Sequence, residues 1–147
     1  MSKITILIPV YNDWQSVFKL LENIDLEVSR LEGEFSIIIV NDASSESRPK
    51  FSAHLDSLKS IQIINMKENR GHARCNAAGL KYINENENFD HVIPMDGDGE
   101  DRPEELNLLI KKIKDYPDLV VTANRVKRSE GFLFKFCYLS HKYLTLI

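Results

Sequence analysis

The chain has 147 residues, enough for one domain with a sizeable core, and its 43% hydrophobic and 28% charged residues are ordinary for a soluble globular protein. A net charge of -3 gives no reason to expect nucleic acid as a partner. The two cysteines, Cys75 and Cys137, form no CxxC pair, which fits a reducing compartment and argues against a thiolate zinc site. No signal-peptide pattern opens the chain, and no apolar run reaches the roughly 20 residues that span a bilayer. The sequence therefore predicts a cytoplasmic protein and leaves contact with a membrane surface open.

Predicted strands and helices alternate along the chain. In chain order they are a strand at residues 4–10, a helix at 14–31, a strand at 35–40, a weaker helix at 46–58, a strand at 61–64, a helix at 71–83, a strand at 90–95, a helix that begins at Pro103 and a strand at 119–122. The strands are runs of Ile, Leu and Val without polar alternation, which is typical of strands buried on both faces. The sequence therefore predicts an α/β fold, a mostly parallel sheet flanked by helices and joined by right-handed crossovers.

Polar residues follow nearly every predicted strand, and ligands of such sheets bind at the carboxyl ends of the strands. Three of the five ends carry a carboxylate, which a purely structural sheet does not need. The five segments are Pro9-Val10-Tyr11-Asn12-Asp13, Asn41-Asp42-Ala43-Ser44, Asn69-Arg70-Gly71-His72, Asp96-Gly97-Asp98-Gly99-Glu100-Asp101 and Asn124-Arg125.

The segment after the fourth strand predicts a metal site. Asp96, Asp98 and Glu100 alternate, so in an extended segment their carboxylates project to one side. Three oxygen ligands suit a hard divalent cation, Mg²⁺ or Mn²⁺. The alternative is an acidic surface turn, because Asp and Gly are favoured in turns. The position of the segment at the end of a buried strand favours the metal.

Several other site classes are excluded by their motifs. An EF-hand would need Gly at the position of Asp101 and an acid at the position of Asn107. The chain has no GxxxxGK, GxGxxG or GxSxG sequence, so P-loop, dinucleotide-binding and serine-hydrolase functions have no support.

The remaining candidates each have a structural alternative. Tyr11 offers a ring face for stacking on a base, or packs as an ordinary aromatic side chain. Asp13 binds ribose or caps the helix that follows, and Asp42 accepts hydrogen bonds from a base or ribose or acts as a turn residue.

A helix N-terminus and three basic side chains are candidates for binding phosphate. Gly71 opens a helix whose free N–H groups suit an anion, and His72 and Arg74 lie close enough in sequence to add charge. Arg125 is a candidate phosphate ligand, or an exposed residue of the basic stretch 125–128.

Taken together, these segments resemble those of the family 2 glycosyltransferases, which have the GT-A fold. Pro9-Val10-Tyr11-Asn12 is similar to the family's opening motif, Asn41-Asp42-Ala43-Ser44 to its second motif and Asp96-Gly97-Asp98 to its DxD signature. The segments 69–80 and 96–103 most resemble the polyprenyl-phosphate sugar transferases, of which dolichol-phosphate mannose synthase is a member. The resemblance covers nearly the whole chain, in five ordered motifs.

The resemblance implies a role for each matching residue. It implies that the nucleoside is held by Pro9, Tyr11, Asp13, Val40 and Asp42. It implies that Asp96 and Gly97 contact the ribose side, Asp98 and Glu100 the metal, and Arg125 the donor phosphates, with Asp98 acting in catalysis. Asp13 stands where the family usually has Glu, and Asn41 where it has an acid, which puts the ribose contact and the choice of base in doubt.

The implied activity is metal-assisted transfer of a sugar from a UDP- or GDP-sugar to an acceptor, with a polyprenyl phosphate as one candidate. A non-catalytic nucleotide-sugar-binding module and a nucleotidyltransferase are the alternatives. A nucleotidyltransferase would usually show a Gly-rich loop with Arg and Lys after the first strand, where this chain has Tyr11-Asn12-Asp13.

The resemblance also implies a donor-binding domain at residues 1–130 whose acceptor half is missing, so we expect the chain to bind donor and to transfer poorly. Residues 131–147 are expected to form an amphipathic helix that leads to that half, lies on a membrane surface or mediates self-association.

Overall fold

The structure is a computed structural model that describes residues 1–117 and 119–123. The chain divides into two compact units, residues 1–111 and residues 112–147, and the first contains the sheet. The strands are β1 (Lys3–Val10), β2 (Glu34–Asn41), β3 (Leu58–Asn65) and β4 (His91–Pro94). The helices are α1 (Trp14–Val28), α2 (His72–Asn86), the short 3₁₀ helix η1 (Pro103–Glu105) and α3 (Leu106–Asp115).

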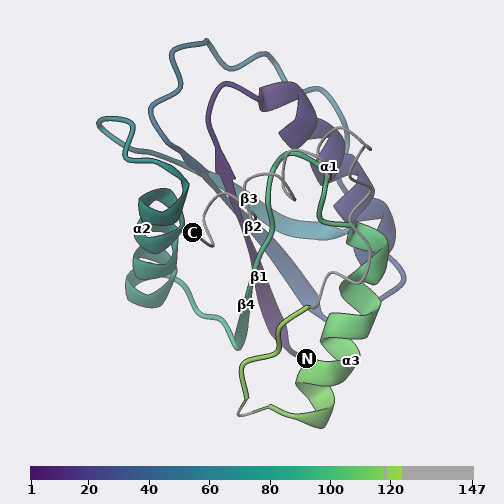
Figure 1. Cartoon of the computed structure of the whole chain (residues 1–147). Helices are drawn as coiled ribbons and strands as arrows, with labels where there is room; N and C mark the ends of the chain where they lie inside the picture. Colours follow the sequence, from purple (N-terminus) through teal and green to yellow (C-terminus); the bar gives the residue numbers. More distant parts are fainter. Residues whose placement is uncertain (118, 124–147) are drawn as a thin grey trace, which may run out of the picture. The chain divides into compact units, whose positions relative to one another are not determined.

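All four strands are parallel, in the order β3-β2-β1-β4 (Figure 1). β1 pairs with β2 along its whole length, from Lys3 opposite Glu34 to Val10 opposite Asn41, and with β4 on its other side. The expectation of a mostly parallel sheet flanked by helices is confirmed. Because the strands run in one direction, their carboxyl ends meet at one edge of the sheet.

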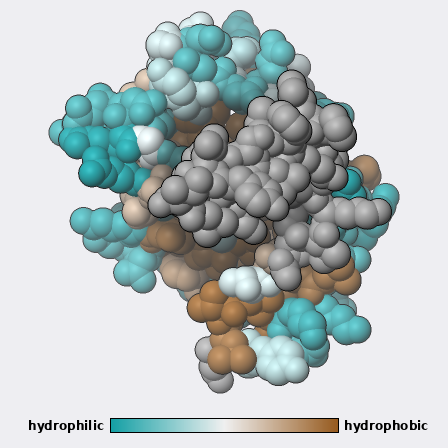
Figure 2. Space-filling view, in the orientation of Figure 1, coloured by the Kyte–Doolittle hydropathy of each residue, from teal (hydrophilic) through white to brown (hydrophobic). Residues whose placement is uncertain are grey.

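The core lies on both faces of β1 and β2, because α1 and α2 cover opposite faces of the sheet (Figure 1). On the α2 face, Leu7, Ile38 and Val40 pack with Cys75 and Ile83 of the helix. Burial of these side chains is the main favourable contribution to the stability of the fold, at roughly 25 cal/mol per Å² of apolar surface. The outward side of α2 is polar, and hydrophilic residues cover this side of the molecule in Figure 2.

A close approach at Gly79 lets α2 lie directly on the sheet. A Cβ at this position would stand 2.8 Å from Cγ2 of Val40 and would also overlap Leu7. Gly79 is buried in the middle of the helix, where glycine weakens the helix itself. The contact between helix and sheet therefore requires the small residue.

Two expected elements are absent from the described residues. Residues 46–57 form neither helix nor strand, and residues 119–122 do not form a strand. Pro49 and the serines around it disfavour a helix interior in the first segment. In the second, the side chains of Leu119 and Val120 are 66% and 91% exposed, so the burial that stabilises an apolar strand is lacking. The helix expected at residues 131–147 lies outside the described residues.

Candidate functional site

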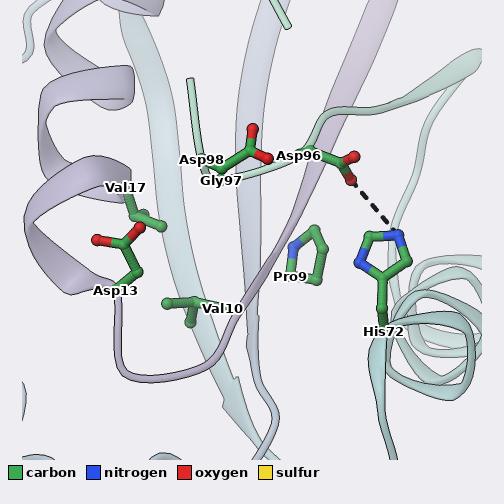
Figure 3. A pocket seen from close by; sticks show the side chains of 8 residues that line it. All are labelled: Pro9, Val10, Asp13, Val17, His72, Asp96, Gly97 and Asp98. Atoms are coloured by element: carbon green, nitrogen blue, oxygen red, sulfur yellow. Dashed lines mark ion pairs between the residues drawn. The ribbon is translucent and has the colours of Figure 1, made fainter. Parts of the chain in front are cut away.

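The candidate site is a cavity of about 190 Å³ at the carboxyl ends of β1 and β4. These two strands flank the point where the strand order reverses, since β2 and β3 lie on one side of β1 and β4 on the other. Parallel sheets bind ligands at such a point. Figure 3 shows the residues that line the cavity, which are Pro9, Val10, Asp13, Val17, His72, Asp96, Gly97 and Asp98.

Asp13 enters the cavity from the first residue before α1. Its Oδ1 accepts a hydrogen bond from the backbone N–H of Ser16 at 3.3 Å, so the side chain caps the helix. The two roles expected for Asp13, capping and ligand binding, are therefore compatible, because the capping carboxylate also lies on the cavity wall (Figure 3).

The acidic segment after β4 is a turn, so the expectation of an extended segment with three carboxylates on one side is wrong. The backbone turns at residues 97–99, and Gly99 has φ +80°. Asp98 Oδ1 accepts the N–H of Glu100 at 2.9 Å, and Asp101 Oδ2 accepts the N–H of Asp96 at 2.9 Å. The turn brings Asp96 and Asp98 to the cavity, whereas Glu100 is exposed and does not line it.

Gly97 is held between the two carboxylates by close packing. A Cβ at this position would stand 2.9 Å from Cγ2 of Val17 and 3.0 Å from the carbonyl oxygen of Pro9. The glycine therefore allows the turn to lie against the end of β1 and the first turns of α1. Its neighbours Asp96 and Asp98 take their positions from this contact.

His72, the first residue of α2, is the only basic residue among those that line the cavity. Its Nε2 lies 3.4 Å from Asp96 Oδ1, so the imidazole pairs with this carboxylate when it is protonated (Figure 3). From sequence, His72 was a candidate only for added charge near a helix N-terminus. Its pairing with Asp96 depends on the order of the strands, and the sequence gives no signal for it. Val10 and Val17, the apolar part of the wall, were not predicted either.

Asp42 binds the loop that precedes α2. Its side chain is 4% exposed, and its two carboxylate oxygens accept the N–H groups of Arg70 and Gly71, each at 2.8 Å. Of the N–H groups at the start of α2, that of Gly71 is thus engaged by Asp42 of the chain itself. Neither Asp42 nor Gly71 lines the cavity.

Val40, expected at the nucleoside, is fully buried in the core. The structure therefore corrects this expectation, because the side chain has no surface for a ligand. The carbonyl oxygen of Val40 accepts the thiol of Cys75 at 3.4 Å. Burial of that thiol, with the nearby Asp42 charge, raises the pKa of Cys75 to about 11, so it is an inert thiol at neutral pH.

The two remaining predicted residues lie elsewhere. Tyr11 is 50% exposed beside the cavity residues Val10 and Asp13 in sequence, and its ring is available for stacking, although it does not line the cavity. Arg125 lies outside the described residues. The structure therefore brings together Pro9, Asp13, Asp96, Gly97 and Asp98 of the predicted set.

A divalent cation at this site needs oxygen ligands from a bound substrate in addition to those that the protein supplies. No group of three or more His, Cys, Asp or Glu side chains within residues 1–117 and 119–123 is arranged to hold a metal. The cavity does present Asp96 and Asp98. Mg²⁺ commonly takes one or two carboxylates and completes its coordination with substrate phosphates and waters. The residues present fit that arrangement and not an all-protein cage.

A second cavity, of about 340 Å³, also borders the acidic turn. It is lined by residues of α1, by residues of the turn and by Pro103. Asp98 is the one predicted ligand that lines both cavities.

The family model described as "Glycosyl transferase family 2" matches residues 5–142. The chain belongs to this family. A curated relative, the undecaprenyl-phosphate 4-deoxy-4-formamido-L-arabinose transferase of Proteus mirabilis, is 29% identical over 134 residues, which are 90% of this chain and 40% of the relative. The chain thus spans less than half the length of that relative.

Solved structures confirm the fold. TarS of S. aureus superimposes with a TM-score of 0.57 and 18% identity over 88% of this chain and 24% of its own length. A shorter form of TarS, solved in complex with UDP, gives a TM-score of 0.57 and 19% identity over 86% of this chain and 38% of its own. This family 2 chain therefore has the expected GT-A type of fold.

Proposed function

We propose that the chain is the donor-binding part of a glycosyltransferase that moves a sugar from a nucleoside-diphosphate sugar to an acceptor. The observation that carries the proposal is the cavity at the ends of β1 and β4, which two carboxylates of the DxD segment line together with Asp13 and His72. Family membership and the UDP complex of TarS support the same donor class.

The donor is divided among the cavity residues and the neighbouring Tyr11. Tyr11 and Asp13, at the end of β1, hold the nucleoside, by stacking and by hydrogen bonds from the ribose. Asp96 and Asp98 lie beyond them at the end of β4, where the diphosphate is placed. His72 lies 3.4 Å from Asp96 Oδ1 through its Nε2 and, when the imidazole is protonated, pairs with that carboxylate at the cavity wall. Arg125 remains a proposed ligand of the phosphates.

Asp96 and Asp98 would hold a divalent cation, Mg²⁺ or Mn²⁺, jointly with the donor phosphates. When bound, the cation offsets the negative charge that builds on the leaving diphosphate. We leave Glu100 out of this ligand set, because it is exposed and does not line the cavity.

For the acceptor we propose a polyprenyl phosphate. The P. mirabilis relative is named for undecaprenyl phosphate, and the chain covers 90% of its own length in that match. A phosphate acceptor is already anionic at neutral pH, so it attacks without a general base. No helix among the described residues is long and apolar enough to cross a bilayer. Because the relative is named for a lipid phosphate, we propose that the protein meets its acceptor at the membrane surface.

Calorimetry tests the donor class. UDP, GDP and their sugars are titrated into the protein with and without Mn²⁺, and into an Asp98→Ala variant with Asn86→Ala as the matched control. Asn86 is exposed near the end of α2 and does not line the cavity. We expect binding that depends on the cation and is lost in Asp98→Ala alone. Absence of binding by every nucleotide would contradict the proposal.

A further inference from the structure

Asn12 lies between the two residues proposed to hold the nucleoside, and its backbone is in the left-handed region with φ 61°. Asparagine tolerates this conformation better than most residues, because its short amide forms local hydrogen bonds. Asn12 does not line the cavity. Its role must therefore come from what its amide contacts.

Those contacts all reach the loop that follows β2. The Nδ2 of Asn12 donates to Ser45 Oγ at 3.0 Å, and its Oδ1 accepts the backbone N–H of Glu46 at 3.1 Å. Ser45 Oγ also lies 3.3 Å from Oδ1, and the backbone N–H of Asn12 donates to Ser44 Oγ at 2.9 Å. Asn12 thus adds side-chain contacts to the backbone hydrogen bond from Asp42 N–H to the carbonyl oxygen of Val10, which joins the ends of β1 and β2.

The loop in question runs from residue 42 to residue 57 without helix or strand. Asp42, at the start of the loop, also accepts the N–H groups of Arg70 and Gly71. Further along, the loop is attached to α1: the ring of Phe51 lies 4.6 Å from that of Phe18, and the N–H of Ser57 donates to Asp25 Oδ1 at 2.8 Å. Long ordered loops of this kind are commonly functional. After Asp42, the amide of Asn12 holds Ser45 and Glu46 of the loop at the end of β1.

We propose that Asn12 is a positioning residue that couples nucleotide binding to the order of the 42–57 loop. The inference rests on the proposed function, because Tyr11 and Asp13 act there as nucleoside ligands. Their backbone positions are set by the conformation of Asn12, which the contacts with Ser44, Ser45 and Glu46 stabilise. Order in the loop and order at the nucleoside ligands are therefore linked.

The coupling is tested with Asn12→Gly, because glycine keeps the left-handed backbone without strain and removes only the amide. Asn12→Gly loses three side-chain hydrogen bonds, two with Ser45 and one with Glu46, and nucleotide binding is expected to weaken roughly tenfold, which corresponds to about 1.4 kcal/mol. Ser45→Ala removes the partner from the loop side and predicts a smaller loss. Both changes break the same contact, between Asn12 and Ser45. The double variant is therefore expected to bind nucleotide no more weakly than Asn12→Gly.

Amide hydrogen exchange gives a readout that needs no nucleotide. In the free protein, Asn12→Gly is expected to accelerate exchange at Glu46 and in the rest of the loop, with Asn86→Ala unchanged. In the unsubstituted protein, nucleotide is expected to slow exchange in the same loop. Unchanged loop exchange in Asn12→Gly, binding within twofold of the unsubstituted protein, or additive losses in the double variant would each overturn the coupling. Absence of nucleotide binding by the unsubstituted protein would instead refute the proposed function.

Discussion

Gly97 offers a sharp test of the site, because a single methyl group there meets two walls of the cavity. In Gly97→Ala the added Cβ would lie 2.9 Å from Cγ2 of Val17 and 3.0 Å from the carbonyl oxygen of Pro9. Neither neighbour retreats easily, since Val17 is fully buried in α1 and Pro9 belongs to β1. Gly97 is not among the residues with positive φ, so the effect comes from packing and not from backbone strain.

Overpacking of this kind costs typically 1–3 kcal/mol, and the turn can relieve it by moving away from β1. That movement would displace Asp96 and Asp98 together. We therefore expect unfolding free energy to fall by about 1–2 kcal/mol and nucleotide affinity to fall by at least about tenfold, which corresponds to 1.4 kcal/mol. Urea denaturation measures the first quantity and calorimetry with Mn²⁺ the second.

Gly79→Ala is the matched control, because it adds the same methyl group to a buried contact whose residues do not line the cavity. The added Cβ would stand 2.8 Å from Cγ2 of Val40, between α2 and the sheet. We expect this variant to lose stability and to keep its nucleotide affinity once folded. Equal affinities for Gly97→Ala and the unsubstituted protein would refute the role of the turn, as would equal losses of affinity in both variants.

Two further predictions concern the buried groups behind the site. Asp42→Asn leaves one oxygen for the two N–H groups of Arg70 and Gly71, so we expect a loss of about 1–3 kcal/mol in urea denaturation and faster amide exchange at both residues; unchanged exchange would contradict the proposed anchoring. The pKa of Cys75, about 11, lies above its unfolded value of about 8.5. The folded thiol therefore stays protonated at pH 9, and in a Cys137→Ser background we expect a disulfide reagent to react only at the rate of unfolding. The raised pKa contributes stability below about pH 8.5 that is lost as pH rises toward 11, and Cys75→Ala should flatten this part of the pH profile; rapid reaction of the folded thiol at pH 9 would contradict its burial.

The central sheet was predictable because its sequence signal is local. Uninterrupted apolar runs at β1 and β2 require burial on both faces, and the structure gives them that burial. The rule that ligands bind at strand ends then located Pro9, Asp13 and Asp96 correctly at the cavity. Each of these inferences uses only residue type and order along the chain.

The wrong expectations concern features that depend on tertiary partners. The alternation of Asp96, Asp98 and Glu100 carries the signal of an extended segment, but side-chain hydrogen bonds to the backbone stabilise a turn instead. Leu119 to Thr122 has strand-forming residues without the burial that a strand needs. The pairing of His72 with Asp96 brings together α2 and the end of β4, and sequence spacing holds no information about it.

The central claim is that a nucleoside diphosphate binds between β1 and β4, and amide chemical shifts measured during a titration with UDP or GDP and Mg²⁺ test it most directly. The account predicts the largest changes at Val10 through Asp13 and at His72, Gly97 and Asp98, which flank or line the cavity of about 190 Å³. It predicts small changes along Lys19 and Asn23, which line only the second cavity. Saturable changes confined to that second cavity, or no changes with any nucleotide, would contradict it.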